Sequence, residues 1–167
     1  LDAVADRDYR MGEAPLSEVI EPIAGSSWER TLRRMAEENG WTTCGDVIRA
    51  YDASVRMVDD AVGAIVQALK SAGEYDETAV IVTADHGESL TEHGILFDHH
   101  GLYDPTIHVP LVVKAPGFEG RDRGFVQHTD LTPTVLDLLG HNVDEERFDG
   151  YSLATTREQG LRRDAVF

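Results

Sequence analysis

The sequence has few lysines, a single cysteine and no long apolar segment, and each shortage excludes something. Lys70 and Lys114 are the only lysines among 15 basic residues, against 31 acidic ones, so the net charge is -16. A surface this acidic repels nucleic acid and anionic membranes, and we expect neither as a partner. No apolar run approaches the roughly 20 residues that span a bilayer. One cysteine, Cys44, excludes an intramolecular disulfide and a thiolate metal cluster.

The excess of carboxylates has two simple explanations. One is adaptation to high salt, which screens the repulsion between like charges. The other is a GC-rich genome, which favours arginine over lysine. We favour the first because genome composition does not explain the acidic residues, and we expect the cytoplasm of a high-salt organism.

The whole sequence of 167 residues is 41% hydrophobic and 28% charged, which is the composition of one folded domain. Residues 1–25 contain Pro15, Pro22 and Gly25, and we expect an extended or loop-like arm there. The pair Ser26 and Glu29 has the spacing of a capping box, which predicts a helix from Ser26 to about Glu38. We therefore divide the chain into an arm with a short helix, residues 1–45, and an α/β domain, residues 46–167.

A longer helix is predicted after this arm and should end at Gly73. Its apolar residues recur at steps of three and four over five turns: Tyr51, Val55, Val58, Val62, Ile65 and Leu69. Such a stripe requires a sheet or another helix to pack against. Strands are expected at 79–83 and 109–113, a helix at 132–139, and a last strand at 164–167. Helices alternating with strands predict an α/β fold.

Asp85 and His86 follow the first expected strand, which reads as buried, and precede Gly87. A carboxylate and an imidazole together suit Ca²⁺, Mn²⁺, Mg²⁺ or Zn²⁺. Neighbouring side chains of a strand point to opposite faces, so both reach one ion only if the backbone turns, which Gly87 favours. The alternative is that Asp85 caps the turn and His86 is a surface residue. Further carboxylates would have to come from elsewhere.

Five ordered motifs between residues 51 and 153 resemble the sulfatase family. They are a helix with Tyr51, Val58, Asp59 and Gly63, the segment Thr78–Gly94 with its Asp85-His86-Gly87-Glu88, Gly101–Asp104 followed by His108–Val113, the closing helix Asp130–Gly140, and Asp149–Leu153.

The resemblance implies a member of the alkaline-phosphatase superfamily, with a sheet sandwiched by helices and present here as the C-terminal part. It implies that Asp85 and His86 bind a divalent metal, with Ca²⁺ expected and Mn²⁺ or Zn²⁺ as alternatives. The implied reaction is hydrolysis of a sulfate ester of a small molecule or glycan. Asp-His in place of the common Asp-Asn resembles the choline-sulfatase and phosphonate-monoesterase branches, so a phosphodiesterase or phosphonate monoester hydrolase is the alternative.

Two further histidines have an implied catalytic role. In those branches a lysine lies five residues before the acidic residue of the Tyr-Glu segment, and counting back from Asp104 gives His99. A protonated His99, or its neighbour His100, would bind an ester oxygen or protonate the leaving group. We expect His93 to position the loop and His108 to be structural, and we assign no role to the remaining two, His128 and His141.

The family's nucleophile, a cysteine in Cys-x-Pro-Ser-Arg that becomes formylglycine, has no counterpart in this sequence. Cys44 is followed by Gly-Asp-Val-Ile and is expected to be structural. An acidic pair near the family's N-terminus is also missing. We therefore expect a fragment that is inactive without the N-terminal half of the enzyme. A non-catalytic α/β binding module is the remaining alternative.

Overall fold

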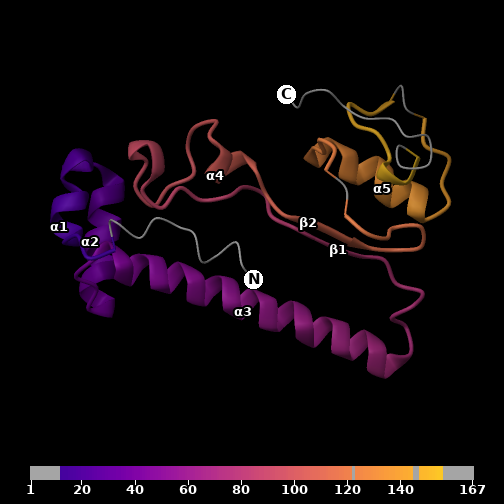
Figure 1. Ribbon diagram of the computed structural model, residues 1–167, viewed down its shortest axis with the longest axis horizontal. Helices are drawn as coiled ribbons and strands as arrows, with labels where there is room; N and C mark the ends of the chain where they lie inside the picture. Colours follow the sequence, from indigo (N-terminus) through magenta and orange to yellow (C-terminus); the bar gives the residue numbers. More distant parts are fainter. Residues whose placement is uncertain (1–11, 122, 145–146, 156–167) are drawn as a thin grey trace. The chain divides into compact units, whose positions relative to one another are not determined.

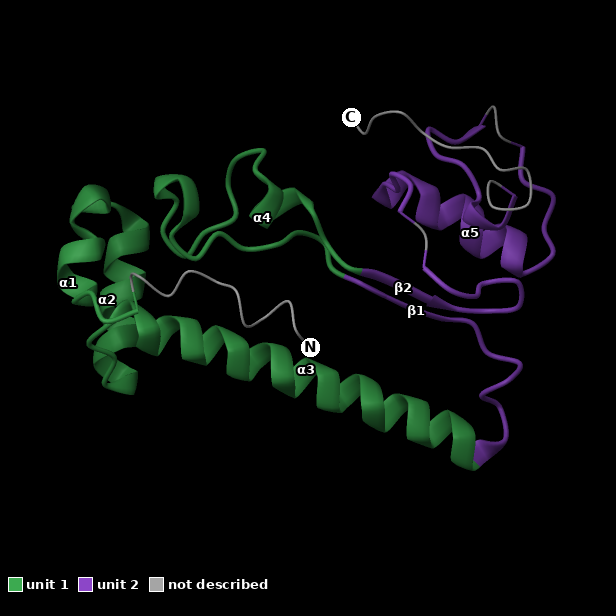
Figure 2. Cartoon of the chain, viewed as in Figure 1, with its two compact units in different colours: residues 1–71, 84–110 green, residues 72–83, 111–167 purple. Residues whose placement is uncertain are grey.

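The computed structural model describes residues 12–121, 123–144 and 147–155 (Figure 1). The chain forms two compact units (Figure 2). The first contains residues 1–71 and 84–110, and the second contains residues 72–83 and 111–167. These units differ from the predicted division between an arm, residues 1–45, and an α/β domain, residues 46–167. That division stays a prediction.

Helices dominate the first unit: α1 (Leu16–Val19), the 3₁₀ turn η3 (Glu21–Ile23), α2 (Ser27–Asn39) and α3 (Cys44–Ala72). The cap predicted for α2 is present, since the Glu29 N–H donates to Ser26 Oγ at 2.9 Å. Gly40 ends α2 with φ of 69°, a left-handed conformation that costs glycine little. Both predicted helices of this unit are therefore confirmed.

The prediction of an extended or loop-like arm for residues 1–25 is wrong for residues 16–23. Residues 16–23 form α1 and η3, and Leu16, Val19 and Ile20 are buried. No helix was predicted here because the prolines interrupt the apolar periodicity. However, Pro15 precedes α1 and Pro22 lies in the first turn of η3, where a missing N–H breaks no helical hydrogen bond.

The core of this unit joins the helices to the loop that follows Glu88. Buried side chains of α1, α2 and the first turns of α3 pack with Leu90, Leu96 and Phe97. Trp28 of α2 also donates its indole N–H to the Leu96 carbonyl oxygen at 2.8 Å. The loop is thus held to the helices by both apolar packing and a hydrogen bond.

The later turns of α3 expose the apolar stripe that the sequence predicted. Val55, Val58 and Ile65 are 54%, 58% and 59% exposed. Only the beginning of the helix, with Cys44, Val47 and Ile48, is buried. The helix is therefore confirmed, but the surface expected to cover its stripe is not among the described residues.

The second unit contains β1 (Val80–Thr83) and β2 (Leu111–Lys114), which pair antiparallel with Val80 opposite Lys114. Both predicted strands are confirmed within two residues. The expectation of a buried strand is wrong here, since the side chains of β1 are half-buried or exposed in a sheet of two described strands. Lys114 donates to the carbonyl oxygens of Thr78 at 3.0 Å and Asp76 at 3.2 Å, which fixes the turn before β1.

The same unit contains the 3₁₀ turn η5 (His128–Asp130) and α5 (Leu131–Leu138), which confirms the helix predicted at 132–139. The strand expected at 164–167 lies outside the described residues. Among the residues described, no helix has both the length and the apolar character that crossing a membrane requires.

Candidate metal site

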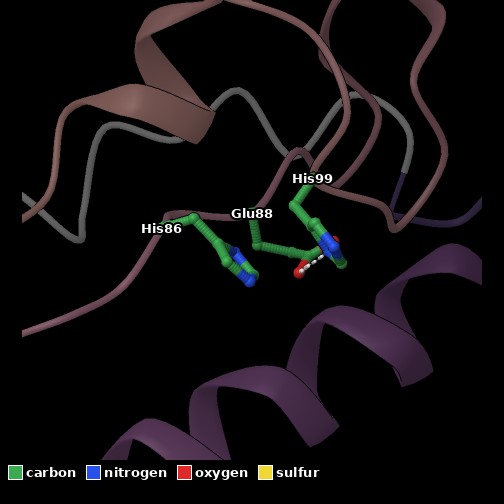
Figure 3. A group of neighbouring side chains, drawn as sticks. All are labelled: His86, Glu88 and His99. Carbon is green, nitrogen blue, oxygen red and sulfur yellow. Dashed lines mark ion pairs between the residues drawn. The ribbon is translucent and has the colours of Figure 1, made fainter.

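Two segments of the histidine-rich loop are joined by a short antiparallel bridge. The Ser89 N–H donates to the Asp98 carbonyl oxygen at 3.0 Å, and the Asp98 N–H donates back at 3.2 Å. This register places Glu88 opposite His99. His86, two residues before Glu88, lies on the same side of an extended chain. The bridge therefore gathers three side chains that can bind a metal (Figure 3).

The donor atoms of His86, Glu88 and His99 all lie within 4.8 Å of one another. His99 Nδ1 is 3.8 Å from Glu88 Oε2, and the rings of His86 and His99 stack with centroids 4.0 Å apart. Donors on one ion with bonds of about 2.0–2.2 Å lie about 3–4 Å apart. Small side-chain movements would therefore bring all three donors onto one ion.

His86 is held in the tautomer that a metal ligand needs. Its Nδ1 lies 2.8 Å from the Gly87 carbonyl oxygen, which can only accept, so Nδ1 carries the proton. Nε2 is then the ring nitrogen that can bind a metal. Nε2 also lies 3.7 Å from Asp85 Oδ2, a separation that one shared ion would produce.

Asp85, the other residue predicted to bind metal, is 88% exposed in its side chain. Its Oδ1 accepts the His86 N–H at 2.9 Å, and this hydrogen bond and the nearby imidazole lower the pKa of Asp85. Asp85 is therefore an anion with one oxygen bound to the backbone and the other beside His86.

Gly87 acts differently from the expectation. Its φ is not left-handed; instead, a Cβ built on it would lie 2.0 Å from the Pro105 carbonyl oxygen. The Gly87 N–H donates to the Thr106 carbonyl oxygen at 2.7 Å. Glycine is needed because two backbone segments approach closely here, which fixes the position of His86 and Glu88.

Glu88 was missed by sequence reasoning. Its side chain is 22% exposed, and its buried Oε1 has no hydrogen-bond partner among the described residues. Burial raises the pKa of Glu88, against the opposing effect of His99. The alternation of His86 and Glu88 was the available signal, but the pairing with His99 depends on the Ser89–Asp98 bridge, which closes an eight-residue loop.

The predicted catalytic pair is divided by the structure. His99 belongs to the cluster, whereas His100 Nδ1 lies 3.1 Å from Asp98 Oδ2. Burial acts to raise the pKa of Asp98, but hydrogen bonds from the His99 N–H and the His100 side chain outweigh it, so this pKa is lowered. His93 stacks on Tyr103 with centroids 4.0 Å apart and is not in the cluster.

Comparison with known proteins identifies the family of the chain. Residues 6–141 match the family model named Sulfatase. The chain belongs to the sulfatase family. It is 35% identical to human N-acetylglucosamine-6-sulfatase over 98 residues, which are 58% of this chain and 18% of that sulfatase. The chain thus spans less than a fifth of that curated relative.

Two solved structures are similar as well. A phosphonate monoester hydrolase from Silicibacter pomeroyi has a TM-score of 0.57 and 33% identity, over 65% of this chain and 22% of that one. A 2-O GAG sulfatase has a TM-score of 0.59 and 29% identity, over 81% and 30%. The alkaline-phosphatase-like fold, present in part, is therefore confirmed.

Cys44 has none of the properties of a sulfatase nucleophile. It is fully buried in the core of the first unit, and burial raises the pKa of its thiol. A thiol of raised pKa without solvent contact is unreactive.

Proposed function

We propose that the complete enzyme hydrolyses sulfate esters at a divalent metal, and that this chain supplies one side of the active site. The observation that carries this proposal is the orientation of His86, whose Nδ1 lies 2.8 Å from the Gly87 carbonyl oxygen and whose Nε2 lies 3.7 Å from Asp85 Oδ2. An oxygen and a nitrogen donor fit Ca²⁺, Mn²⁺ or Zn²⁺, with Ca²⁺ expected when further carboxylates complete the site.

The residues have separate tasks in this proposal. Asp85 and His86 hold the metal, which when bound polarises an ester oxygen. His99 or His100 binds the anion or protonates the leaving group. Asp98 supports both, because its carboxylate accepts the His99 N–H at 2.7 Å and lies beside the His100 ring. Family membership and the shared fold support these roles.

The substrate is proposed to be a sulfate ester of a sugar or small molecule. One relative is named for a 6-sulfate of N-acetylglucosamine and one similar structure for a 2-O-sulfate of a glycosaminoglycan. The second candidate is hydrolysis of phosphonate monoesters, which the similarity to the Silicibacter pomeroyi enzyme favours.

The 167-residue chain by itself is proposed to be inactive. Its one cysteine is buried and lies outside a Cys-x-Pro-Ser-Arg pattern, so the formylglycine and the remaining acidic ligands are expected from another part of the enzyme. A high-salt source and a cytoplasmic location stay predictions.

The test is a comparison of aryl sulfate, sulfated glucosamine, phosphodiester and phosphonate substrates with the complete enzyme and with this chain. Asp85→Ala and His86→Ala should each lower kcat/KM for the sulfate ester at least about 100-fold, while His141→Ala should not. Preference for the phosphonate would favour the second candidate. Turnover by the isolated chain would contradict its inactivity, and a complete enzyme without metal or activity would favour a binding module.

A further inference from the structure

We propose that His86, Glu88 and His99 are the ligands of a second metal site. This site binds Zn²⁺ and does not use Asp85. Two imidazoles and one carboxylate suit Zn²⁺ and its first-row neighbours. Ca²⁺ and Mg²⁺ prefer oxygen donors in larger number. The chemistry of the site thus differs from that of the Asp85–His86 pair.

Two independent features of the cluster indicate a ligand. Glu88 Oε1 is buried without a hydrogen-bond partner in the described part of the chain. A buried carboxylate oxygen without a partner is costly, and a cation bound by the same carboxylate would offset that cost. His86 separately directs Nε2 toward a ligand, because Nδ1 donates to the Gly87 carbonyl oxygen. Such a backbone bond is the common support of a histidine that binds metal.

The backbone holds the three donors in place. Glu88 lies between the Gly87 N–H, bound to the Thr106 carbonyl oxygen, and Ser89, paired in both directions with Asp98. His99 follows Asp98 directly. Preorganised donors lose less conformational entropy when they bind an ion, which favours binding even with three protein ligands.

Asp85 is not among the three residues whose donor atoms all lie within 4.8 Å of one another, although its Oδ2 lies 3.7 Å from His86 Nε2. His86 is common to both sites, so one ion at Nε2 excludes the other. If the proposed function holds, Zn²⁺ bound through Glu88 should inhibit the complete enzyme by occupying His86 and His99. This consequence rests on the proposed function, whereas Zn²⁺ binding by the isolated chain does not.

The test is calorimetric titration of the purified 167-residue chain with ZnCl₂, in excess Mg²⁺ to occupy surface carboxylates. We expect one Zn²⁺ per chain with micromolar affinity. Glu88→Gln, which keeps the shape of the side chain, and His99→Ala should each weaken binding about tenfold or more. Asp85→Ala should weaken binding less than Glu88→Gln does, because Asp85 contacts His86 but is not one of the three clustered donors. His141→Ala, outside the cluster, should change the affinity by less than about twofold. Circular dichroism checks that each variant is folded.

Two results would overturn the site: no binding at millimolar Zn²⁺, or binding that Asp85→Ala weakens and Glu88→Gln does not. The second would place the ion on the Asp85–His86 pair and would leave the proposed function intact. Conversely, Zn²⁺ binding that depends on Glu88, together with a complete enzyme that hydrolyses no sulfate ester, would retain the site and remove the proposed function.

Discussion

Asp130 in the second unit and Glu88 in the first are both carboxylates shielded from solvent, but the surrounding backbone treats them in opposite ways. Asp130 is 1% exposed, and its two oxygens accept the N–H groups of Gln127 at 2.8 Å and Tyr151 at 2.9 Å. Glu88 has one buried oxygen without a partner and another 3.8 Å from His99 Nδ1. One carboxylate is enclosed by donors, and the other faces a second potential ligand.

The network around Asp130 extends to its neighbours. Thr134 donates to the Asp130 carbonyl oxygen at 2.6 Å and accepts the Leu153 N–H at 2.9 Å. The Asp137 carboxylate accepts the hydroxyls of Ser152 and Thr155. A satisfied polar network of this kind fixes a unique structure, whereas an unsatisfied buried group lowers stability and is retained for another reason. The difference separates a structural carboxylate from one that we assign to a ligand.

The largest effect should follow removal of the satisfied carboxylate. Asp130→Ala removes the carboxylate that accepts the Gln127 and Tyr151 N–H groups, so we expect a loss of about 3 kcal/mol in the free energy of unfolding. Urea unfolding followed by circular dichroism measures it. Asp149→Ala, an exposed neighbour, is the matched control and should lie within about 0.5 kcal/mol of the unchanged chain. Equal losses for both would contradict the structural role of Asp130.

A glycine supports each region by allowing close backbone contact, and alanine should disturb both. The added Cβ would lie 2.0 Å from the Pro105 carbonyl oxygen at Gly87 and 2.2 Å from the Thr129 carbonyl oxygen at Gly150. We expect each substitution to cost about 2 kcal/mol of unfolding free energy. Gly63→Ala in α3 meets no atom within 4 Å and should instead stabilise by up to about 1 kcal/mol. Gly87→Ala should also weaken Zn²⁺ binding, which Gly150→Ala should leave unchanged.

Local patterns predicted the helices and strands because each carries its signal within a few residues. The Ser26–Glu29 cap, the α3 stripe and Gly73 marked elements that the structure confirms. The failures concern contacts beyond the local sequence. The helical turns at 16–23 are stabilised by burial in a core shared with α2 and α3, and β1 is half-buried in a sheet of two described strands.

The candidate site was predictable only in part. Position after a strand and resemblance to sulfatases indicated Asp85, His86 and His99, and the structure brings His86 and His99 together. Glu88 reads as an ordinary acidic residue in a chain with 31 of them. Its significance comes from the Ser89–Asp98 bridge, whose register no local pattern fixes.

Asp46 is a third carboxylate, and its contribution to stability should depend on pH. The N–H groups of Thr42 and Thr43 each donate to Asp46 Oδ2 at 2.8 Å, and these bonds hold the pKa of Asp46 well below its usual value. The unfolded chain therefore binds a proton here at higher pH than the folded chain. Its stabilisation is complete above the unfolded pKa of about 4 and declines as the pH falls through the folded pKa. Asp46→Asn should lower the thermal midpoint at neutral pH, and this difference should shrink below about pH 4. A constant difference would contradict the assignment.

The smallest effect on stability should come from the unsatisfied carboxylate. Glu88→Gln removes a partly buried charge that no hydrogen bond satisfies at Oε1, so we expect a change within about 0.5 kcal/mol, or a slight gain. Because burial raises the pKa of Glu88, the folded chain keeps a proton there at pH values where the unfolded chain has lost it. The unchanged chain should therefore lose stability relative to Glu88→Gln as the pH rises through that range.

Asp130→Asn is the matched substitution, and it should destabilise because its amide group opposes one N–H donor. If Glu88→Gln were as damaging as Asp130→Asn, Glu88 would be a structural residue, and the contrast between the two carboxylates would not hold.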